Sequence, residues 1–317
     1  MPLNEFELIK NYFTREPKRA DVLLGIGDDG AILTPNALNQ WVWTTDTLND
    51  GVHFFSDDPP HAIGYKAMAV NLSDLAAMGA TPAWASLSLC LPEFNADWLS
   101  QFSAGIFELI DKYNIDLVGG DTTRGPLSIC VSLIGHVKPD QALRRDGAKV
   151  GDGIYLGKSI GDAGLVLRQR QKSSPDVTLK AENMRPLHYP VPQIELGLAL
   201  AGRASSAIDI SDGFAQDLGH ILKRSGKGAI IHLDQIPLSD YARGYIEATQ
   251  DWAQILNAGD DYVLCFTMQD QNLACLENNF SEHLIYRIGE ITAGAGISWL
   301  QHHNEIELRN IDGFKHF

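Results

Sequence analysis

Hydrophobic and polar positions along the first half of the chain follow two different periods. Residues 41–48 (WVWTTDTL) are rich in β-branched and aromatic residues, and residues 84–92 (WASLSLCLP) alternate at period two, so both segments are predicted strands. Residues 59–80 begin with prolines, continue with Ala and Leu and reach Gly79, which predicts a helix that stops there. Residues 96–114 are a predicted amphipathic helix with one apolar stripe: Leu99, Phe102, Ile106, Leu109 and Ile110.

Two more predicted strands, 115–121 and 127–137, complete this half, and short period-two strands are typical of sheets with one exposed face. Residues 138–152 are charged and almost lack core residues, so we place a domain boundary there. The second half restarts with a predicted strand and alternates strands with helices, and residues 260–268 (DDYVLCFTM) form one of its later predicted strands. The chain therefore has a predicted α/β or α+β fold in two domains. We place these domains at residues 1–137 and 138–317.

The chain of 317 residues carries 40 acidic and 25 basic residues, which gives a net charge of −15. Nucleic-acid binding requires a basic surface, so we expect no nucleic-acid partner. An acidic protein that handles anionic substrates needs cations between the two, and the charge balance therefore favours a metal-dependent enzyme. Solubility alone would explain the same balance.

The four cysteines form no C-x-x-C pair, and three of them lie in apolar segments, so we predict neither a disulfide framework nor a zinc site. The first residues lack the basic and apolar regions of a signal peptide. No run reaches the ~18 apolar residues of a membrane span. We therefore expect a cytoplasmic protein without a membrane partner.

The segment LLGIGDDGAIL, at residues 23–33, contains the G-x-G-x-x-G pattern of dinucleotide-binding turns. Such a turn must open directly into a helix, and Pro35 follows Gly30 too closely for a good helix start. A Walker A motif is absent. The two acids in this segment, Asp28 and Asp29, instead indicate either a metal site or an acidic turn.

Several other carboxylates are flanked by small or apolar residues and lack neighbouring Lys or Arg. Asp74 lies inside a predicted helix, where Asp is unfavourable, and Asn71 lies one turn earlier on the same face. Two carboxylates about 4 Å apart repel by about 4 kcal/mol at an effective dielectric constant of roughly 20, and Mg²⁺ offsets such repulsion. Taken singly, each acid fits a turn or a cap, as Asp212 does before a helix. Together they favour a metal site.

Eight stretches of the chain resemble the thiamine-monophosphate kinase family, a relative of aminoimidazole ribonucleotide (AIR) synthetase. They follow the family's order: LGIGDDGAIL, TTDTLNDGVHF, YKAMAVNLSDLAAMGATPAW, LVGGDTTRGPLS, RRDGAKVGDGIY, AIDISDGFAQDLGHI, AGDDYVLCF and DGFKHF. The resemblance implies Mg²⁺-dependent transfer of the γ-phosphoryl group of ATP to thiamine monophosphate, which yields thiamine diphosphate, the last step of its biosynthesis. It also implies a homodimer in which two N-terminal sheets form a barrel, with the C-terminal α/β domain closing the active site.

Position by position, the resemblance implies metal sites at Asp29, Thr44, Thr45, Asp46, Asp74, Asp121, Asp209 and Asp212. It implies ATP contacts at Gly120, Asp121, Arg145 and Ser211, and thiamine phosphate contacts at His53, Asp260 and Phe314. Two positions depart from the family pattern: Asp260 replaces the usual Glu of a Gly-Glu-Asp-Tyr motif, and Lys315 replaces a common acid. A phosphate acceptor is already ionised at neutral pH, so we assign no catalytic His or Ser.

AIR synthetase is the nearest alternative enzyme, but DGFKHF and AGDDY point away from it. A selenophosphate-synthetase-like enzyme would need a reactive Cys near its start, and the first Cys here is Cys90. The related hydrogenase-maturation protein carries a reactive Cys at its C-terminus, where this chain has His316 and Phe317. A non-catalytic metal or nucleotide sensor would keep the same pocket; the full set of acids favours the enzyme.

Overall fold

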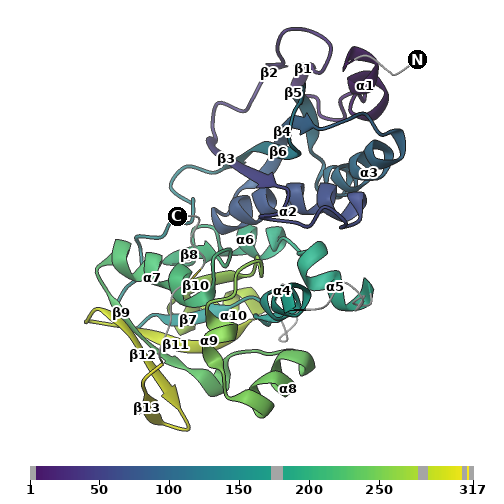
Figure 1. Cartoon of the computed structure of the whole chain (residues 1–317). Helices are drawn as coiled ribbons and strands as arrows, with labels where there is room; N and C mark the ends of the chain where they lie inside the picture. The colour runs from purple at the N-terminus through teal and green to yellow at the C-terminus, as the bar shows by residue number, and fades with distance from the viewer. Residues whose placement is uncertain (1–4, 173–180, 278–284, 309–312, 314–317) are drawn as a thin grey trace. The chain divides into compact units, whose positions relative to one another are not determined.

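The chain forms two compact units of mixed α and β structure (Figure 1). The computed structural model describes residues 5–172, 181–277, 285–308 and 313. The first unit contains Met1–Leu75 and Ala80–Pro139, and the second contains Ala76–Gly79 and Asp140–Phe317. None of the described helices is long and apolar enough to cross a bilayer.

A four-stranded sheet with the order β3-β6-β4-β5 is the centre of the first unit. Its strands pair antiparallel except for β4 and β5, which are parallel, and β1 and β2 form a separate antiparallel pair. The elements are α1 (Glu5–Tyr12), β1 (Val22–Leu24), β2 (Ile32–Leu33), β3 (Gln40–Asn49), α2 (Pro60–Ala77), β4 (Thr81–Leu91), α3 (Ala96–Tyr113), β5 (Asp116–Arg124) and β6 (Ser128–Val137).

One face of this sheet is buried, as the period-two pattern predicts: β6 alternates between buried and half-buried residues along its whole length. Helix α2 covers the buried face, where Leu75 approaches Gly135 of β6. Helices α2 and α3 then pack closely through two glycines. A Cβ atom on Gly64 would lie 2.1 Å from the Phe102 carbonyl oxygen, and one on Gly105 would lie 2.0 Å from the His61 carbonyl oxygen. Glycine lowers helix propensity by about 1 kcal/mol, and here it permits this close packing.

The predicted helix 96–114 is confirmed as α3, and all five residues of its apolar stripe are buried. The Asn95 side chain accepts a hydrogen bond from the Trp98 amide at its N-terminus. At its C-terminus Asn114 adopts a left-handed conformation, in which the helix ends.

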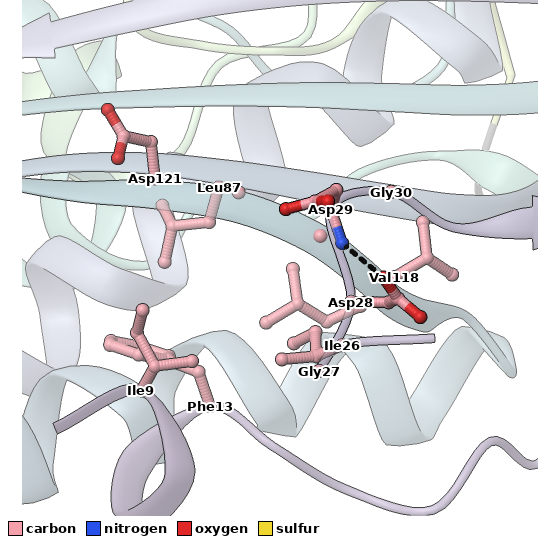
Figure 2. A pocket seen from close by; sticks show the side chains of 13 residues that line it. Ile9, Phe13, Ile26, Gly27, Asp28, Asp29, Gly30, Leu87, Val118 and Asp121 are labelled. Atoms are coloured by element: carbon pink, nitrogen blue, oxygen red, sulfur yellow. Dashed lines mark hydrogen bonds between the residues drawn. The ribbon is translucent and has the colours of Figure 1, made fainter. Parts of the chain in front are cut away.

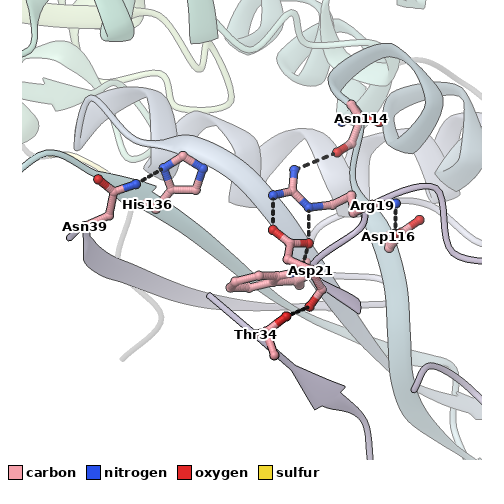
Figure 3. A network of polar contacts seen from close by, with 8 residues as sticks. Arg19, Asp21, Thr34, Asn39, Asn114, Asp116 and His136 are labelled. Carbon is pink, nitrogen blue, oxygen red and sulfur yellow. Dashed lines mark hydrogen bonds and ion pairs between the residues drawn. The ribbon is translucent and has the colours of Figure 1, made fainter. Parts of the chain in front are cut away.

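The segment that precedes the glycine-rich loop is attached to the sheet by a polar network (Figure 3). Asp116, at the start of β5, accepts hydrogen bonds from the backbone amides of Lys18 (3.0 Å) and Arg19 (2.8 Å). The Arg19 guanidinium donates to both carboxylate oxygens of Asp21, which holds the pKa of that carboxyl below its ordinary value. Trp84 donates to the same carboxylate at 3.2 Å. The chain is thus held in place immediately before Gly25.

The second unit is built on a seven-stranded sheet with the order β13-β12-β9-β11-β7-β10-β8, in which only β9 and β12 pair in parallel. Its core joins the sheet to the apolar face of α7. The elements are β7 (Gly153–Leu156), α4 (Asp162–Lys172), α5 (Ala181–His188), α6 (Ile194–Leu200), β8 (Ser206–Asp209), α7 (Phe214–Ser225), β9 (Gly228–His232), η1 (Leu233–Gln235), α8 (Asp240–Thr249), α9 (Trp252–Leu256), β10 (Leu264–Met268), α10 (Asp270–Glu277), β11 (Tyr286–Thr292), β12 (Gly296–Gln301) and β13 (Asn304–Ile306).

Two predicted strand boundaries are wrong. The strand predicted to end at Asp121 continues to Arg124, because residues 122–124 pair with the last residues of β4. The segment 260–268 is a strand only from Leu264 onward. The amides of Asp260 and Tyr262 bond to carbonyl groups of a neighbouring turn, so these residues form a loop.

We expect Asp116→Ala to lower the free energy of unfolding by about 1–3 kcal/mol, because two partly buried backbone amides lose their acceptor. Asp111→Ala is the matched control. Asp111 is exposed and forms surface ion pairs with Arg15 and Lys18, so its loss should change stability by less than about 1 kcal/mol. Urea unfolding followed by tryptophan fluorescence measures both. Equal losses would mean that Asp116 acts only as a surface charge.

Candidate functional site

The glycine-rich loop and strand β5 line a pocket of about 410 Å³ in the first unit (Figure 2). Asp28 and Asp29 lie next to each other on the loop, and Asp121 lies on the neighbouring strand. The rest of the wall is mainly apolar. It includes Ile9 and Phe13, near the N-terminus, with Ile26, Leu87, Leu117 and Val118. The pocket therefore combines carboxylates with a surface suited to a flat apolar group.

Local backbone geometry positions these acids. The Asp29 amide donates to Asp28 Oδ1 at 2.8 Å, which holds the Asp28 side chain against its own loop. Gly120 has φ +154°, and a Cβ atom there would lie 1.9 Å from the Leu87 carbonyl oxygen, so only glycine fits directly before Asp121. The residues after Gly30 form β2 instead of a helix, which confirms that this loop is no dinucleotide-binding turn.

A second group of predicted residues meets where α2 faces β3. The Thr44 hydroxyl donates a hydrogen bond to Asp74 Oδ2. Asp46 lies on the same face of β3 as Thr44, because side chains alternate along a strand. Thr45 lies on the opposite face, where its hydroxyl is 2.8 Å from the Ser132 hydroxyl. The structure thus brings Thr44 and Asp74 together and directs the Thr45 side chain away from them.

No three His, Cys, Asp or Glu side chains in the described part of the chain are close enough to hold a metal ion by themselves. The predicted metal residues form smaller groups, and Mg²⁺ requires no larger one when phosphate oxygens complete its shell. Asn71 supplies a further observation: its Oδ1 is fully buried, one turn before Asp74, and lacks a hydrogen-bond partner within the described residues. Carboxylate, hydroxyl and amide oxygens are hard donors, so these residues fit Mg²⁺.

His53 lies in the turn after β3. Its Nδ1 accepts a hydrogen bond from the Asn49 amide at 3.0 Å, so the neutral ring carries its proton on Nε2. The Lys66 ammonium of α2 donates to the His53 carbonyl oxygen at 3.0 Å. These two bonds set the position of the imidazole.

In the second unit, Asp209 ends β8, and Ser211 and Asp212 form the turn that follows. Asp209 is buried and lies opposite Leu264 of β10. Asp212 accepts a hydrogen bond from the Gln216 side chain at 3.0 Å. The alternative role of Asp212 as the N-cap of the next helix is wrong, because Gly213 occupies that position.

Asp217, which the sequence analysis missed, is the residue that holds this turn. It lies in α7, and its Oδ2 accepts three backbone hydrogen bonds, from Ser211 (3.0 Å), Asp212 (3.1 Å) and Gly213 (3.2 Å). Burial raises the pKa of this carboxyl to about 7, although the amides act in the opposite direction. An acid in the first turns of a helix that follows Ser-Asp-Gly is the signal that could have identified it.

The loop from Gly259 to Tyr262 packs against the same turn. The Asp260 amide donates to the Ser211 carbonyl oxygen at 2.9 Å, and the Tyr262 amide donates to the Ile210 carbonyl oxygen at 2.8 Å. Asp260 (φ 67°) and Tyr262 (φ 50°) are both left-handed, and the Tyr262 hydroxyl donates to Asp260 Oδ1 at 3.1 Å. Non-glycine residues in this region cost about 1–3 kcal/mol, and they concentrate at functional sites. Ser211 and Asp260, predicted from separate motifs, are thus direct neighbours.

Arg145 is exposed, and its carbonyl oxygen accepts a hydrogen bond from the Ser225 hydroxyl at 3.1 Å. The preceding residue, Arg144, accepts a hydrogen bond from the Ala207 amide at the start of β8. The segment of Arg145 therefore runs beside β8. No described contact joins its guanidinium to Ser211.

Phe314, predicted to contact thiamine phosphate, lies outside the described residues. Gly313 is described and lies against the turn after β8. A Cβ atom on Gly313 would be 2.6 Å from Gln216 Cβ and 2.8 Å from the Asp212 carbonyl oxygen. The residue before Phe314 is therefore next to Asp212.

Comparisons with known proteins add to this geometry. Residues 27–137 match the family model for the AIR synthase related protein N-terminal domain, and residues 149–299 match that for the C-terminal domain. A thiamine-monophosphate kinase of Salmonella typhimurium is 46% identical and aligns with 87% of this chain and 86% of its own length. The crystal structure of thiamine-monophosphate kinase from Stenotrophomonas maltophilia is 45% identical over 94% of this chain and 97% of that one, with a TM-score of 0.85. AaThiL complexed with AMPPCP and TMP is 30% identical over 92% of each chain, with a TM-score of 0.75.

We expect Gly259→Ala to lower the free energy of unfolding by about 1–3 kcal/mol, because overpacking forces the backbone apart. The new Cβ atom would lie 2.1 Å from the Ser211 carbonyl oxygen. Gly244→Ala, in helix α8, is the matched control. Its new Cβ atom would lie in open space, so this substitution should raise the free energy of unfolding by about 0.5–1 kcal/mol. Urea unfolding of both variants distinguishes them, and a stabilised Gly259→Ala would contradict the close contact between the two loops.

Proposed function

This chain belongs to the thiamine-monophosphate kinase family, and we propose that it uses carboxylate-held cations to transfer a phosphoryl group from ATP to thiamine monophosphate. The activity follows from relatives of that name that align with almost the whole chain, one of them solved with AMPPCP and TMP. The observation that carries the residue assignment is the pocket of the first unit, which sets Asp28, Asp29 and Asp121 beside an apolar wall.

The nucleotide is assigned to that pocket. Its apolar side chains, among them Phe13 and Leu87, provide a surface for the base, and glycines that line the pocket, including Gly27, Gly30 and Gly120, place no side chain in the way of the phosphates. Asp29 and Asp121 would hold Mg²⁺ there. Thr44, Asp46 and Asp74 would hold a second ion, Thr45 would contribute only through its backbone, and Asp209 and Asp212 are the corresponding donors of the second unit. When bound, Mg²⁺ neutralises phosphate charge and aligns the reacting groups.

The chain's own groups bind and orient the two substrates. Ser211 and, in our assignment, Arg145 contact the nucleotide, because a hydroxyl and a guanidinium both donate to phosphate oxygens. His53 presents an Nε2 proton to the acceptor phosphate, and Asp260, with Phe314, contacts the thiamine moiety. The acceptor phosphate is an anion at neutral pH, so its attack needs positioning and no general base.

We also propose that the active form is a homodimer joined through the open face of the first unit's sheet. Trp41 and Trp43 on this face are 50% and 71% exposed, and β3 is an edge strand. Apart from His136, the other outward residues of β3 and β6 are uncharged: Thr45, Thr47, Asn49, Ser128, Cys130, Ser132 and Ile134. Burial lowers the pKa of His136 at the end of this face, so it is neutral as well. A second copy can therefore meet the β3 and β6 part of this face without repulsion between facing charges, although each chain carries a charge of −15.

The described cysteines support a cytoplasmic location. Cys90, Cys130 and Cys265 are free thiols. Free thiols are the usual state in a reducing compartment.

We expect the purified protein to convert ATP and thiamine monophosphate to thiamine diphosphate and ADP only when Mg²⁺ is present, with EDTA abolishing turnover. Asp121→Asn should lower kcat by about 100-fold, because charge stabilisation at the phosphates is lost. Asp97→Asn, an exposed acid of α3, should keep wild-type activity. Coupled ADP release and chromatography of the product measure both. Absence of product from the wild type would contradict the function; an unchanged Asp121→Asn would contradict only the site.

For the dimer, we expect Trp43→Asp to convert the protein to monomers, because a buried, unpaired charge opposes association. Light scattering after size-exclusion chromatography gives the mass. Tyr241→Asp, at an exposed aromatic residue of α8, should remain dimeric. A wild-type protein with the mass of one chain would refute the dimer.

A further inference from the structure

We infer that Asp217 is a positioning residue of this site: its carboxylate occupies the N-terminus of α7 in place of a phosphate and sets the turn that presents Ser211 and Asp212. The inference rests on the proposed function, because it assigns a role to a residue behind two proposed ligand contacts. Asp217 lies in the stretch AIDISDGFAQDLGHI, but the resemblance assigns it no role.

The first argument is the use of the backbone amides. A helix N-terminus with exposed amides attracts anions, and phosphate-binding loops exploit this property. Here the amides of Ser211, Asp212 and Gly213 all donate to one buried carboxylate oxygen, at 3.0–3.2 Å. A phosphate cannot use donors that already face the protein interior. The turn is therefore left with its side chains, a hydroxyl and a carboxylate, as ligand contacts.

The second argument is that the same turn is held on its carbonyl side. The loop of Asp260 and Tyr262 donates to the carbonyl groups of Ile210 and Ser211. Gly213 has φ +122°, and a Cβ atom there would lie 2.6 Å from the Asn257 carbonyl oxygen. With amides and carbonyls both bonded, the backbone that carries Asp212 depends on Asp217 from one side and on residues 257–262 from the other, while the Gln216 side chain donates a hydrogen bond to the Asp212 carboxylate itself.

A purely structural cap predicts a different outcome from a positioning residue. Loss of a cap costs about 0.5–2 kcal/mol of stability wherever the helix lies, and leaves ligand binding unaffected. Loss of a group that orients a ligand contact typically costs 10–100-fold in affinity or activity. The two roles therefore separate when stability and ligand dependence are measured on the same variants.

The test uses Asp217→Asn and Asp217→Ala in the full chain, with Asp152→Asn as the matched control. Asp152 is also buried in the second unit and also accepts a backbone amide, from Lys149 at 2.9 Å. Thermal unfolding reports stability. Calorimetric binding of Mn²⁺ with a non-hydrolysable ATP analogue reports ligand affinity, and kcat with the Mg²⁺ concentration at half-maximal rate reports turnover.

We expect Asp217→Ala to weaken binding of the metal–nucleotide complex and raise the half-maximal Mg²⁺ concentration, each by about tenfold or more. Asp217→Asn keeps the size of the side chain and one acceptor oxygen, but a neutral group then faces three amides. Its affinity for the metal–nucleotide complex and its half-maximal Mg²⁺ concentration should therefore lie between those of Asp217→Ala and the wild type. Asp152→Asn should lose stability and change neither quantity. If Asp217→Ala does not fold, Asp217→Asn decides the question.

Equal ligand dependence in Asp217→Asn, Asp152→Asn and the wild type would overturn the inference and leave the kinase assignment intact. A wild-type protein that binds the metal–nucleotide complex but yields no thiamine diphosphate would refute the proposed reaction. In that case the binding data on the Asp217 variants still test the positioning role.

Discussion

Repulsion between negative charges is the constraint on which this architecture depends. The reaction joins two phosphate-bearing substrates on a chain with a net charge of −15, and most of the groups proposed to meet them are carboxylates. These carboxylates repel the phosphates until cations enter, because like charges about 4 Å apart oppose each other by several kcal/mol in a partly buried setting. The acids must therefore be held by the fold rather than by one another. This requirement explains why glycines and backbone hydrogen bonds surround these acids.

The fold holds these acids mainly through glycines, backbone amides and short side-chain contacts. Gly120 lets β5 approach β4 so closely that no other residue fits, and Asp121 follows directly. Asp28 is held by an amide of its own loop, and Asp74 by the Thr44 hydroxyl. Arg19 is instead paired with Asp21, which anchors the segment ahead of the loop. Neutral partners fix the acids without neutralising the charge that a cation requires.

The sequence predicts what periodicity and residue type control. The apolar stripe of α3 is buried as expected. Pro35 argues against a helix after Gly30, and the structure has a strand there. The resemblance identifies a family that the comparisons confirm. What the sequence does not predict are contacts between distant segments. The extension of β5 past Asp121 depends on pairing with β4. The contact of Asp217 depends on how α7 packs against the turn that precedes it. Thr45 adjoins Thr44 in sequence, but side chains alternate along a strand, so the two point to opposite faces of the sheet. The order of residues in the motif alone does not show this difference.

The shorter acid at position 260 becomes understandable from the backbone. Asp260 adopts φ 67°, and among non-glycine residues Asp and Asn enter the left-handed region most readily, because their short polar side chains bond locally. Its carboxylate does so by accepting the Tyr262 hydroxyl, while its amide is bonded to Ser211. A Glu in this conformation would gain reach and lose that local compensation. The exchange therefore favours a rigid loop over a longer side chain, and it makes the position of Asp260 depend on the Ser211 turn. Because that turn is itself held by Asp217, the proposed substrate contact and the proposed nucleotide contact share one support.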